Sequence, residues 1–460
     1  MDAQISENRP AAEKSWKCGT LVYTASGLII LFVLLLTGDF IWSLRERSAG
    51  VIASLMFKKY GASDFLIGLL LTSLPSLLSV LICPIISVRS DRHRGRLGRR
   101  IPYLFLTTPI AVAGLIGMAL SPWIGQQVIQ YANAHHVDSN VMVLCVLGVF
   151  WTLFEFGAIA GNTIFTALIN DVVPQKMLGR FYGLFRIMSI AAGILYTGFF
   201  LEPSNNHPEL FFGAVALIYG LGFTAMCFLV KEGKYPDPEP IDPRATPARR
   251  FAGATKVYFK ECYTNPYYLL LFVFWLLATF SFMPVNTYCI FYAGKCGVSL
   301  DTYGKCISAG FIVSLIISFP LGVLADKFHP LRCGIVSIGL YGLASFLSFF
   351  FIRSPLLFCI AFIAHILLSS IFNTLTASLL LRLLPHDRFA QFASASQILN
   401  SFWIILVMPV IGKLLDWLHN DYDYLYLMGF LISAGAVICG LWLSVWIRRR
   451  CGGLEHYQAP

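Results

Sequence analysis

Charged side chains are scarce in this 460-residue chain. Asp, Glu, Lys and Arg together make up 13% of the residues, whereas 57% are hydrophobic. The mean hydropathy is +0.71. A soluble protein carries about 25% charged residues, because its surface must face water. The shortage of charge therefore excludes a soluble protein of this size and indicates a polytopic membrane protein.

Several functional patterns are also missing. The twelve cysteines stand singly in apolar segments, without the close pairs of a metal or redox site. Cys296 and Cys306 flank a predicted outer loop, where a disulfide is an alternative to two free thiols. The N-terminus shows no apolar region with a cleavage site, so we expect no cleavable signal peptide. No His-rich or paired acidic motif supports a membrane-embedded lipid-modifying enzyme. We predict neither an enzyme nor a bound metal or cofactor.

What the chain has in abundance is long apolar runs. A helix needs about 20 residues to cross the hydrocarbon core of a bilayer. The runs predict twelve spans, at Phe32–Phe57, Asp64–Val88, Ile101–Ser121, Val141–Asn170, Gly179–Leu201, Leu210–Val230, Pro266–Tyr292, Thr302–Ala325, Leu331–Ile352, Pro355–Leu384, Phe389–Trp417 and Tyr424–Ile447. The expected fold class is an all-α polytopic membrane protein with twelve transmembrane helices in two pseudo-symmetric six-helix bundles.

The first apolar region, Leu21–Phe57, is too long for a simple span. As one helix it would measure roughly 56 Å, against a hydrocarbon core of about 30 Å. Placing the span at Phe32–Phe57 sets Asp39 and the charges of Arg45–Arg47 inside the membrane. The alternative span ends at Leu44 and leaves Arg45–Arg47 at the outer surface. The topology of the later helices is the same in both cases.

Basic residues predict the orientation. Six arginines lie within Arg89–Arg100, a loop that the positive-inside rule places in the cytoplasm. Most of the 34 Lys and Arg residues fall on that same side. The net charge of +10 therefore reflects the orientation of the protein in the membrane and indicates no nucleic-acid partner. We predict a multi-pass protein of the cell membrane with both termini in the cytoplasm.

A polar, proline-rich linker divides the chain. We predict a cytoplasmic tail at 1–20, a six-helix bundle at 21–230, a cytoplasmic linker at 231–265, a second bundle at 266–447 and a tail at 448–460. The halves repeat weakly: Asp91-Arg92 after the second helix corresponds to Asp326-Lys327 after the eighth, and Arg180-Phe181 to Arg388-Phe389. Two such halves are typical of transporters, whose binding site lies near the midplane.

Two motifs resemble the major facilitator superfamily, in particular its glycoside–pentoside–hexuronide:cation symporters and the related proton-coupled sucrose carriers. Their loop after helix two reads Asp-Arg-x-x-Ser-Arg-aromatic-Gly-Arg-Arg, and the matching positions here are Asp91, Arg92, Arg96, Gly98, Arg99 and Arg100. Gly95 replaces the Ser and Leu97 the aromatic residue. The segment Ala167–Asp171 is similar to the end of helix four in sucrose carriers. Sixteen residues before Asp171, where those carriers have an intramembrane Asp, this chain has Glu155.

The resemblance implies a conformational latch in the cytoplasmic loops. Its predicted members are Asp91, Arg92, Arg96, Gly98, Arg99, Arg100, Asp171, Arg180, Asp326 and Arg388. Asp91 is expected to accept hydrogen bonds from arginine side chains. It is also expected to lie near the N-terminal end of helix eleven, around Phe389, where the helix dipole favours negative charge.

Charges at membrane depth are candidates for the transport site, because each costs about 2.5–3.5 kcal/mol or more at the centre of the bilayer. Glu155 lies near the middle of its span, and Asn162 stands two turns further along the same helix. We predict that Glu155 binds a proton or the substrate. The alternative is a structural carboxylate that pairs with a neighbouring helix.

Helix one and helix five add further charged candidates. Asp39 and Glu46 are seven residues apart and are predicted to share one face, with Arg45 and Arg47 at its sides. Of these, Asp39, Glu46 and Arg47 are the site candidates. These three residues bind substrate or form a local Glu–Arg pair that holds the helix in place. Arg186 corresponds to an arginine that contacts sugar in related melibiose carriers. Its donors suit a carboxylate or sugar hydroxyls, with Glu155 as the expected partner, although it could instead snorkel to the surface.

The second half offers neutral polar residues at membrane depth, namely Asn286, His365, Asn373, Gln397 and Asn400. Each is a candidate for the cavity, and each taken alone is more often a helix-to-helix contact. One of four tryptophans within spans is also predicted to line the cavity, from among Trp42, Trp151, Trp275 and Trp403.

The functional hypothesis is secondary active transport of a small hydrophilic solute, with a sugar or glycoside favoured, by symport with H⁺. Melibiose-type carriers bind Na⁺ through helix-two carboxylates, and the stretch Ser73–Pro84 has none, which favours H⁺ as the coupling ion. A drug or metabolite:proton antiporter or exporter of the same fold is the alternative. The predicted partners are the substrate and the lipid bilayer, and the protein is predicted to be a monomer.

Overall fold

The computed structural model describes residues 16–131, 138–236, 259–385, 388–454 and 457. Within these ranges twelve helical spans are long and apolar enough to cross a membrane, which confirms the predicted fold class. In chain order their helices are α1 (Ala25–Lys59); α2 (Asp64–Gly68), η1 (Leu69–Ser73) and α3 (Leu74–Arg92); α4 (Ile101–Tyr131); α5 (Ser139–Val172); η2 (Gln175–Met177), α6 (Leu178–Leu195), η3 (Tyr196–Phe200) and α7 (Leu201–Asn206); α8 (Pro208–Ile218), η4 (Tyr219–Phe223) and α9 (Thr224–Leu229); α11 (Pro266–Phe280) and α12 (Met283–Lys295); α13 (Leu300–Phe328); α14 (Pro330–Phe351); α15 (Pro355–Leu375) and α16 (Leu379–Leu383); α17 (Phe389–Trp417); and α18 (Tyr424–Cys451).

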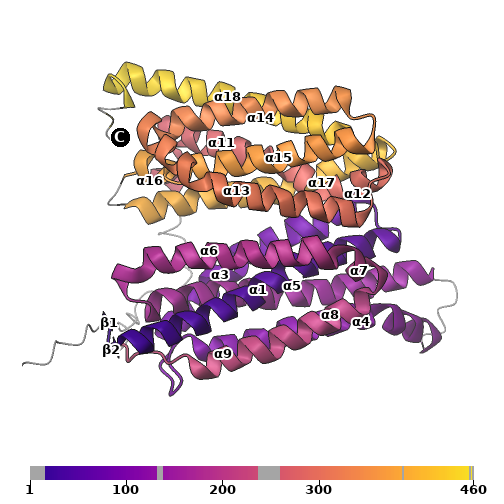
Figure 1. Ribbon diagram of the computed structural model, residues 1–460, viewed down its shortest axis with the longest axis vertical. Helices are drawn as coiled ribbons and strands as arrows, with labels where there is room; N and C mark the ends of the chain where they lie inside the picture. Colours follow the sequence, from indigo (N-terminus) through magenta and orange to yellow (C-terminus); the bar gives the residue numbers. More distant parts are fainter. Residues whose placement is uncertain (1–15, 132–137, 237–258, 386–387, 455–456, 458–460) are drawn as a thin grey trace, which may run out of the picture.

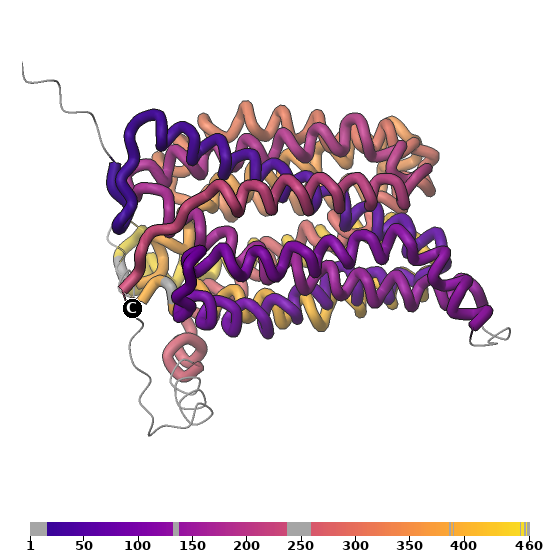
Figure 2. Tube along the Cα trace, turned by 90° about the horizontal axis from the view of Figure 1, so that it is seen from below, coloured from indigo at the N-terminus to yellow at the C-terminus, as the bar shows by residue number. Residues whose placement is uncertain are grey.

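The helices form two groups that lie side by side (Figure 1). One group contains α1 to α9, and the other contains α11 to α18. Figure 2 shows that the helices of both groups run along a common direction. We call the end that carries the arginine-rich loop 89–100 the basic end. The end where α1 and α17 finish, at Lys59 and Trp417, is the far end.

Local chemistry explains where many helices start. The side chains of Thr24, Ser63, Asp138, Ser299 and Ser354 each accept a backbone N–H of the first turn that follows. Such caps satisfy donors that have no partner within the helix. Proline occupies the first turn of α8, α11, α14 and α15, where no N–H is needed. Apolar runs between such start signals therefore predict the helices well.

Helix α1 is continuous across the charged segment of the first apolar region. It runs from Ala25 to Lys59 without a break, and Arg45 in its middle is only 2% exposed. The alternative that ended the span at Leu44, with Arg45–Arg47 at the outer surface, is therefore wrong. The extra length extends α1 toward the basic end, because a helix can continue beyond the hydrocarbon core into the interface.

Two loop expectations also change. The predicted spans leave residues 122–140 between Ser121 and Val141 as a loop, but α4 continues to Tyr131. Hydrophobicity marks only the part of a helix that lies in hydrocarbon, whereas backbone hydrogen bonding extends it further. Cys296 and Cys306 are both free thiols, so the alternative of a disulfide between them is wrong.

A short β-hairpin precedes α1 within the segment expected to be a tail. Its strands β1 (Trp16–Cys18) and β2 (Leu21–Tyr23) pair antiparallel. The Cys18 thiol donates to the carbonyl oxygen of Asp171 at 3.2 Å. The hydroxyl oxygen of Thr20 accepts the backbone N–H of Lys234 at 2.8 Å. The hairpin therefore attaches the start of the described chain to the end of α5 and to the residues that follow α9.

Candidate functional site

Two adjoining cavities lie between the two helix groups. The smaller has a volume of about 380 Å³ and the larger of about 750 Å³. Five residues line both of them, namely Val51, Thr197, Asn286, Tyr303 and Ile307. Because the cavities share these walls, they form one polar interior space at the interface of the halves. The larger cavity extends toward the basic end, since Arg186 and Asn373 line it.

One face of α1 supplies much of the first-half wall. Arg47, Gly50, Val51 and Ser54 all line the cavities. Their spacing of three and four residues places them on a single helical stripe. Arg47 therefore faces the larger cavity, which is the position that the substrate-binding alternative for helix one required. Its guanidinium lies 5.3 Å from the ring centroid of Phe311 on α13, across the interface.

Glu155 on α5 lines the smaller cavity. The charged groups that act most strongly on its carboxylate are Arg45, of opposite sign, and Glu46, of like sign, both on α1. Arg186 was the expected partner of Glu155, but it lines the larger cavity and is not among these groups. Arg45 on α1 is instead the cation that acts on the carboxylate, although no ion pair within 4.0 Å joins these two described residues. A prediction from sequence spacing alone could not include how α1 and α5 are rotated against each other.

Arg45 is the residue that sequence reasoning missed. Its side chain is 2% exposed, and its guanidinium lies 3.8 Å from the ring centroid of Trp42, 4.7 Å from that of Tyr219 and 5.3 Å from that of Phe154. Three aromatic faces attract a desolvated cation without neutralising it. Its Nε and Nη1 atoms are buried and have no hydrogen-bond partner. Arg45 is thus a buried cation without an acidic partner within 4.0 Å among the described residues, and its charge acts on Glu155. In the sequence, only its position between Asp39 and Glu46 indicated a role at the site.

The other acidic candidates of helix one do not face the cavities. Asp39 is 1% exposed and accepts a hydrogen bond from Ser43 at 3.5 Å. Glu46 is exposed and lines neither cavity. Asp39 and Glu46, which were predicted to share one face, therefore differ in exposure, since Asp39 is enclosed and Glu46 is open. Seven residues fall only slightly short of two helical turns, but neighbouring helices cover the two positions differently.

The polar candidates of the second half separate into two groups. Asn286 lines both cavities, and Asn373 lines the larger one. His365 is buried behind Asn286. Gln397 and Asn400 on α17 line neither cavity, and neither does Asn162 on α5. Of the four tryptophans considered, Trp151 lines the smaller cavity, and its indole N–H donates to the carbonyl oxygen of Leu70 at 2.8 Å.

His365 orients the amide of Asn286. The ring Nε2 lies 3.0 Å from Asn286 Oδ1, and Nδ1 lies 3.2 Å from the hydroxyl of Tyr341. Because Oδ1 only accepts, Nε2 carries the proton of this hydrogen bond. The Tyr341 hydroxyl itself donates to the carbonyl oxygen of Ser281 at 3.2 Å. The NH₂ group of Asn286 is left for the cavity. This buried chain therefore presents a fixed hydrogen-bond donor to a bound solute.

Backbone and carboxylate contacts join the two halves at the far end. Asp416 on α17 accepts the backbone N–H groups of Asp64 at 2.8 Å and Phe65 at 3.0 Å. An acidic side chain of one half thus caps the first turn of α2 in the other. The hydroxyl of Tyr288 donates to the carbonyl oxygen of Asp64 at 3.0 Å. These contacts close the interface at this end.

The side chain of Asp64 belongs to the same contact. It is 0% exposed and forms an ion pair with Lys58 at 2.5 Å. It also accepts from the hydroxyl of Tyr422, in the other half, at 3.2 Å. Deeper in the interface, the hydroxyls of Thr197 and Ser308 lie 2.9 Å apart. Closure of the far end therefore depends on polar groups as well as on apolar packing.

Glycines permit the close approach of the backbones at this end. A Cβ added at Gly412 would lie well under 3.0 Å from the carbonyl oxygen of Asp64, and one at Gly304 equally close to that of Thr197. Each contact crosses from one half to the other. A side chain at either position would push the halves apart, because neither opposing atom is the end of a flexible side chain.

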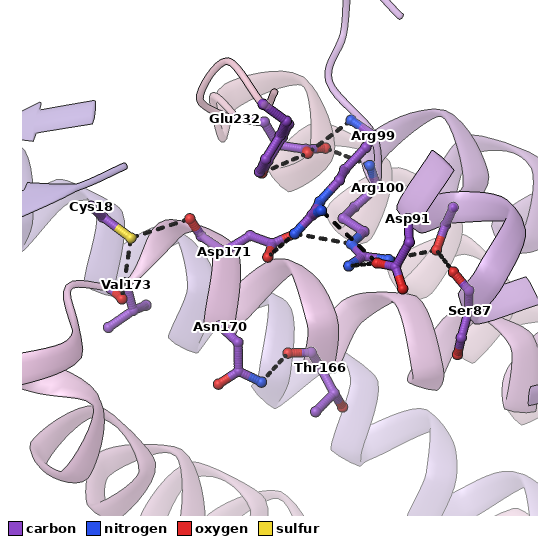
Figure 3. A network of polar contacts seen from close by, with 12 residues as sticks. Cys18, Ser87, Asp91, Arg99, Arg100, Thr166, Asn170, Asp171, Val173 and Glu232 are labelled. Atoms are coloured by element: carbon purple, nitrogen blue, oxygen red, sulfur yellow. Dashed lines mark hydrogen bonds and ion pairs between the residues drawn. The ribbon is translucent and has the colours of Figure 1, made fainter. Parts of the chain in front are cut away.

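Four of the predicted latch residues, Asp91, Arg99, Arg100 and Asp171, form a network at the basic end (Figure 3). Arg99 donates to both carboxylate oxygens of Asp171, at 2.9 and 2.5 Å, and Arg100 donates to Asp171 at 2.9 Å. Arg100 also pairs with Asp91, as the prediction of arginine donors to Asp91 required. The hydrogen bonds from Arg99 to Asp171 raise the pKa of the guanidinium. Asp91, with a side chain 52% exposed, is the outermost carboxylate of this network.

Glu232 is a further member that the sequence did not indicate. Its carboxylate accepts the backbone N–H groups of Arg99, Arg100 and Ile101 at 2.9, 2.8 and 2.7 Å. It thereby caps α4 and ties the residues after α9 to the arginine-rich loop. Gly98, with φ +99°, passes directly beside Glu232. Only glycine suits that backbone conformation.

The predicted latch residues of the second half pair with residues outside the predicted set. Asp326 pairs with Arg382 at 2.5 Å, and Arg388 pairs with Glu261 at 3.6 Å. Arg382 was not predicted. Arg96 and Arg180 are exposed on the surface of the first half.

Replacing Asp91 with Asn tests the predicted latch. We expect transport to fall several-fold with little change in melting temperature, because Asp91 is half-exposed and its loss leaves the pairs to Asp171 intact. Asp171→Asn should instead lower the melting temperature, since it leaves two clustered guanidiniums without their shared acceptor. Uptake assays and thermal unfolding of both variants provide the check. Unchanged uptake by Asp91→Asn would contradict the latch.

Comparisons with known proteins give consistent results. The family model described as MFS/sugar transport protein matches residues 51–413. A search of curated proteins finds no match. The fold resembles a D-xylose-proton symporter, with 16% identity, 90% of this chain and 97% of that chain covered, and a TM-score of 0.59. It also resembles the nucleoside transporter NupG, with 13% identity, coverage of 93% and 100%, and a TM-score of 0.61. For a bacterial homolog of the human lysosomal transporter Spinster the identity is 16%, the coverage 95% and 98%, and the TM-score 0.60.

Proposed function

The chain belongs to the MFS/sugar transport protein family of the major facilitator superfamily, and we propose that it is a proton-coupled symporter of a small hydrophilic solute, with a sugar or glycoside favoured. Proteins of this family and fold are transporters and not enzymes. The similar structures include a xylose-proton symporter, a nucleoside transporter and a peptide transporter. The solute class, the coupling ion and the direction of transport are therefore the parts that the proposal adds.

Alternating access is supported by the unequal ends of the interface. At the far end Asp416 and Tyr288 join the halves through Asp64. The ion pairs of the latch residues at the basic end instead lie within one half, as those of Asp91 and Asp326 do. The larger cavity extends toward this basic end. We infer that the described state is closed at the far end and receives solute from the basic end, and that the halves rock to reverse this.

The observation that carries the proposal is that Glu155 lines the smaller cavity and is acted on by Arg45, a buried cation that lies against three aromatic rings. A charged carboxylate at membrane depth is unfavourable unless a cation or a proton compensates it. Arg45 supplies partial compensation, while Glu46 repels the carboxylate. Proton binding to Glu155 therefore changes the electrostatic energy of the space between the halves. A change of this kind can bias the equilibrium between the two open states.

The orientation and assembly in the proposal follow from the basic residues and from the fold. We place the basic end in the cytoplasm of a cell, by the positive-inside rule. The two six-helix bundles at 21–230 and 266–447 are the units that rock, joined by the linker 231–265. Solute and proton then move through a monomer, since the cavities lie between halves of one chain.

Reconstitution tests the proposal directly. Purified protein in liposomes should accumulate a labelled sugar or glycoside when a pH gradient, acidic on the solute side, is imposed. A panel with a pentose, a disaccharide, a nucleoside and a dipeptide covers the solute classes named by the similar structures. Binding without any flux, or flux that ignores the pH gradient for every solute, would overturn proton symport.

Uptake should be indifferent to Na⁺. Glu155 is the only carboxylate among the described residues that line the two cavities, and Ser73–Pro84 in the second span contains none. Replacing Na⁺ by choline at a clamped pH gradient should therefore leave the initial rate unchanged. A rate that depends on a Na⁺ gradient at constant pH would show that Na⁺ is the coupling ion.

A further inference from the structure

We propose that the transported solute carries an anionic group, a carboxylate or a phosphate, which binds between Arg47 and Arg186. This inference rests on the proposed function and specifies its substrate class. Both guanidiniums line the larger cavity, Arg47 from α1 and Arg186 from α6. No carboxylate is among the described residues that line this cavity. The space therefore has two positive charges on its walls and no negative one.

The acidic candidates Asp39, Glu46 and Glu155 are grouped with a different arginine, Arg45. Glu46 acts on both Asp39 and Glu155, and Arg45 acts on Glu155, so these four residues form one electrostatic group. Arg47 and Arg186 stand outside it. Within the described part of the chain, neither has an ion pair within 4.0 Å or a hydrogen bond, and the ring of Phe311 is the contact of Arg47. A negatively charged ligand would compensate the positive charges of Arg47 and Arg186.

Guanidinium chemistry specifies the ligand further. Arginines at membrane depth usually face a partner or a water-filled path. Arg47 and Arg186 are both exposed, and both line the larger cavity, where a solute can reach them. Arginine donates in a fixed planar fork that matches the two oxygens of a carboxylate or phosphate. The Asn286 NH₂ group, oriented by His365, adds a neutral donor to the same cavity. Three donors with no acidic competitor favour an anion over a neutral solute.

The remaining wall suits a hydroxylated body attached to that anion. Asn373 donates to the carbonyl oxygen of Ser369 at 2.9 Å, which leaves its own carbonyl oxygen as an acceptor for the cavity. The hydroxyl of Ser314 is buried in the wall without a hydrogen-bond partner. Phe185 and Phe362 supply apolar surface. A volume of about 750 Å³ exceeds that of a simple inorganic anion, so an acidic sugar or a sugar phosphate fits better.

The test uses solutes that share the glucose ring and differ at C6, where the group is neutral or anionic. Glucose, glucuronate and glucose 6-phosphate are added to the purified full-length chain at constant ionic strength, and binding is followed by thermal shift and titration calorimetry. We expect at least one acidic member to bind more tightly than glucose. Comparison of the affinities for glucuronate and glucose 6-phosphate then identifies whether a carboxylate or a phosphate is preferred.

Variants assign the effect to the cavity. Arg186→Gln and Arg47→Gln should each weaken binding of the acidic solute roughly tenfold or more, and by a larger factor than binding of glucose, because the charge-assisted hydrogen bonds to the anion are lost. Arg186→Lys, which keeps the charge without the fork, should retain part of the affinity. Arg353→Gln is the control, since Arg353 is 68% exposed at the far end of the second half and outside both cavities.

Two outcomes overturn the proposal. One is a panel in which no acidic member binds more tightly than glucose. The other is an acidic preference that survives in both Arg47→Gln and Arg186→Gln. Either can occur while the pH gradient still drives uptake of neutral sugars, which would leave the proposed symport intact. Conversely, anion binding that depends on the two arginines stands even if flux ignores the pH gradient.

Discussion

Glu155→Gln is expected to abolish accumulation against a gradient while permitting exchange of solute across the membrane. Glutamine keeps the size and hydrogen bonding of the side chain at the smaller cavity but makes it permanently neutral. The halves should then rock without a proton. In wild type, one pH unit supports about a tenfold solute gradient for symport of one proton, since 1.4 kcal/mol corresponds to a factor of ten. In the variant the ratio should fall to about 1.

Net uptake and counterflow in vesicles, measured on the same preparations, separate coupling from folding. Glu202→Gln provides the matched control, because Glu202 is an exposed acid of the same half and lines neither cavity. A Glu155→Gln protein that still concentrates solute in response to the pH gradient would make Glu155 structural. The proton site would then have to be sought at Asp39 or Glu46.

Gly412→Ala is expected to prevent full closure of the far end. The new Cβ would lie well under 3.0 Å from the carbonyl oxygen of Asp64, a backbone atom of the opposite half. Overpacking of this kind typically costs about 1–3 kcal/mol, which shifts a two-state equilibrium by roughly 5- to 150-fold. The described state, closed at the far end, should lose population to its far-end-open counterpart. Transport should fall accordingly, because the cycle requires both states.

Labelling from the far side measures this shift. A cysteine at Thr72, in the lining of the smaller cavity, should react faster with a membrane-impermeant maleimide in the Gly412→Ala background. Gly294→Ala is the control, since a Cβ at Gly294 on α12 meets no atom within 4 Å. Equal labelling rates together with wild-type transport would show that the contact at Gly412 does not limit closure.

The candidate site was only partly predictable from sequence. Glu155, Arg47, Arg186, Asn286 and Asn373 were chosen because polar residues at membrane depth are costly, and the structure places all five at the cavities. The same criterion also selected Asn162, Gln397 and Asn400, which line neither cavity. The free-energy cost of a polar side chain at membrane depth does not show whether that side chain lines a cavity or contacts a neighbouring helix, because either environment supplies hydrogen-bond partners.

The amino-acid sequence by itself determined the number of spans, their approximate limits and the arginine-rich loop. The thickness of hydrocarbon demands about 20 apolar residues per crossing and excludes clustered arginines, and both constraints act on local sequence. Only the tertiary structure decided that Arg45 rather than Arg186 acts on the charge of Glu155, that Glu232 caps α4, and that Gly412 meets Asp64. Each of these contacts depends on how far one helix is rotated and shifted against another. That choice follows from the packing of many side chains together, and no short segment contains it.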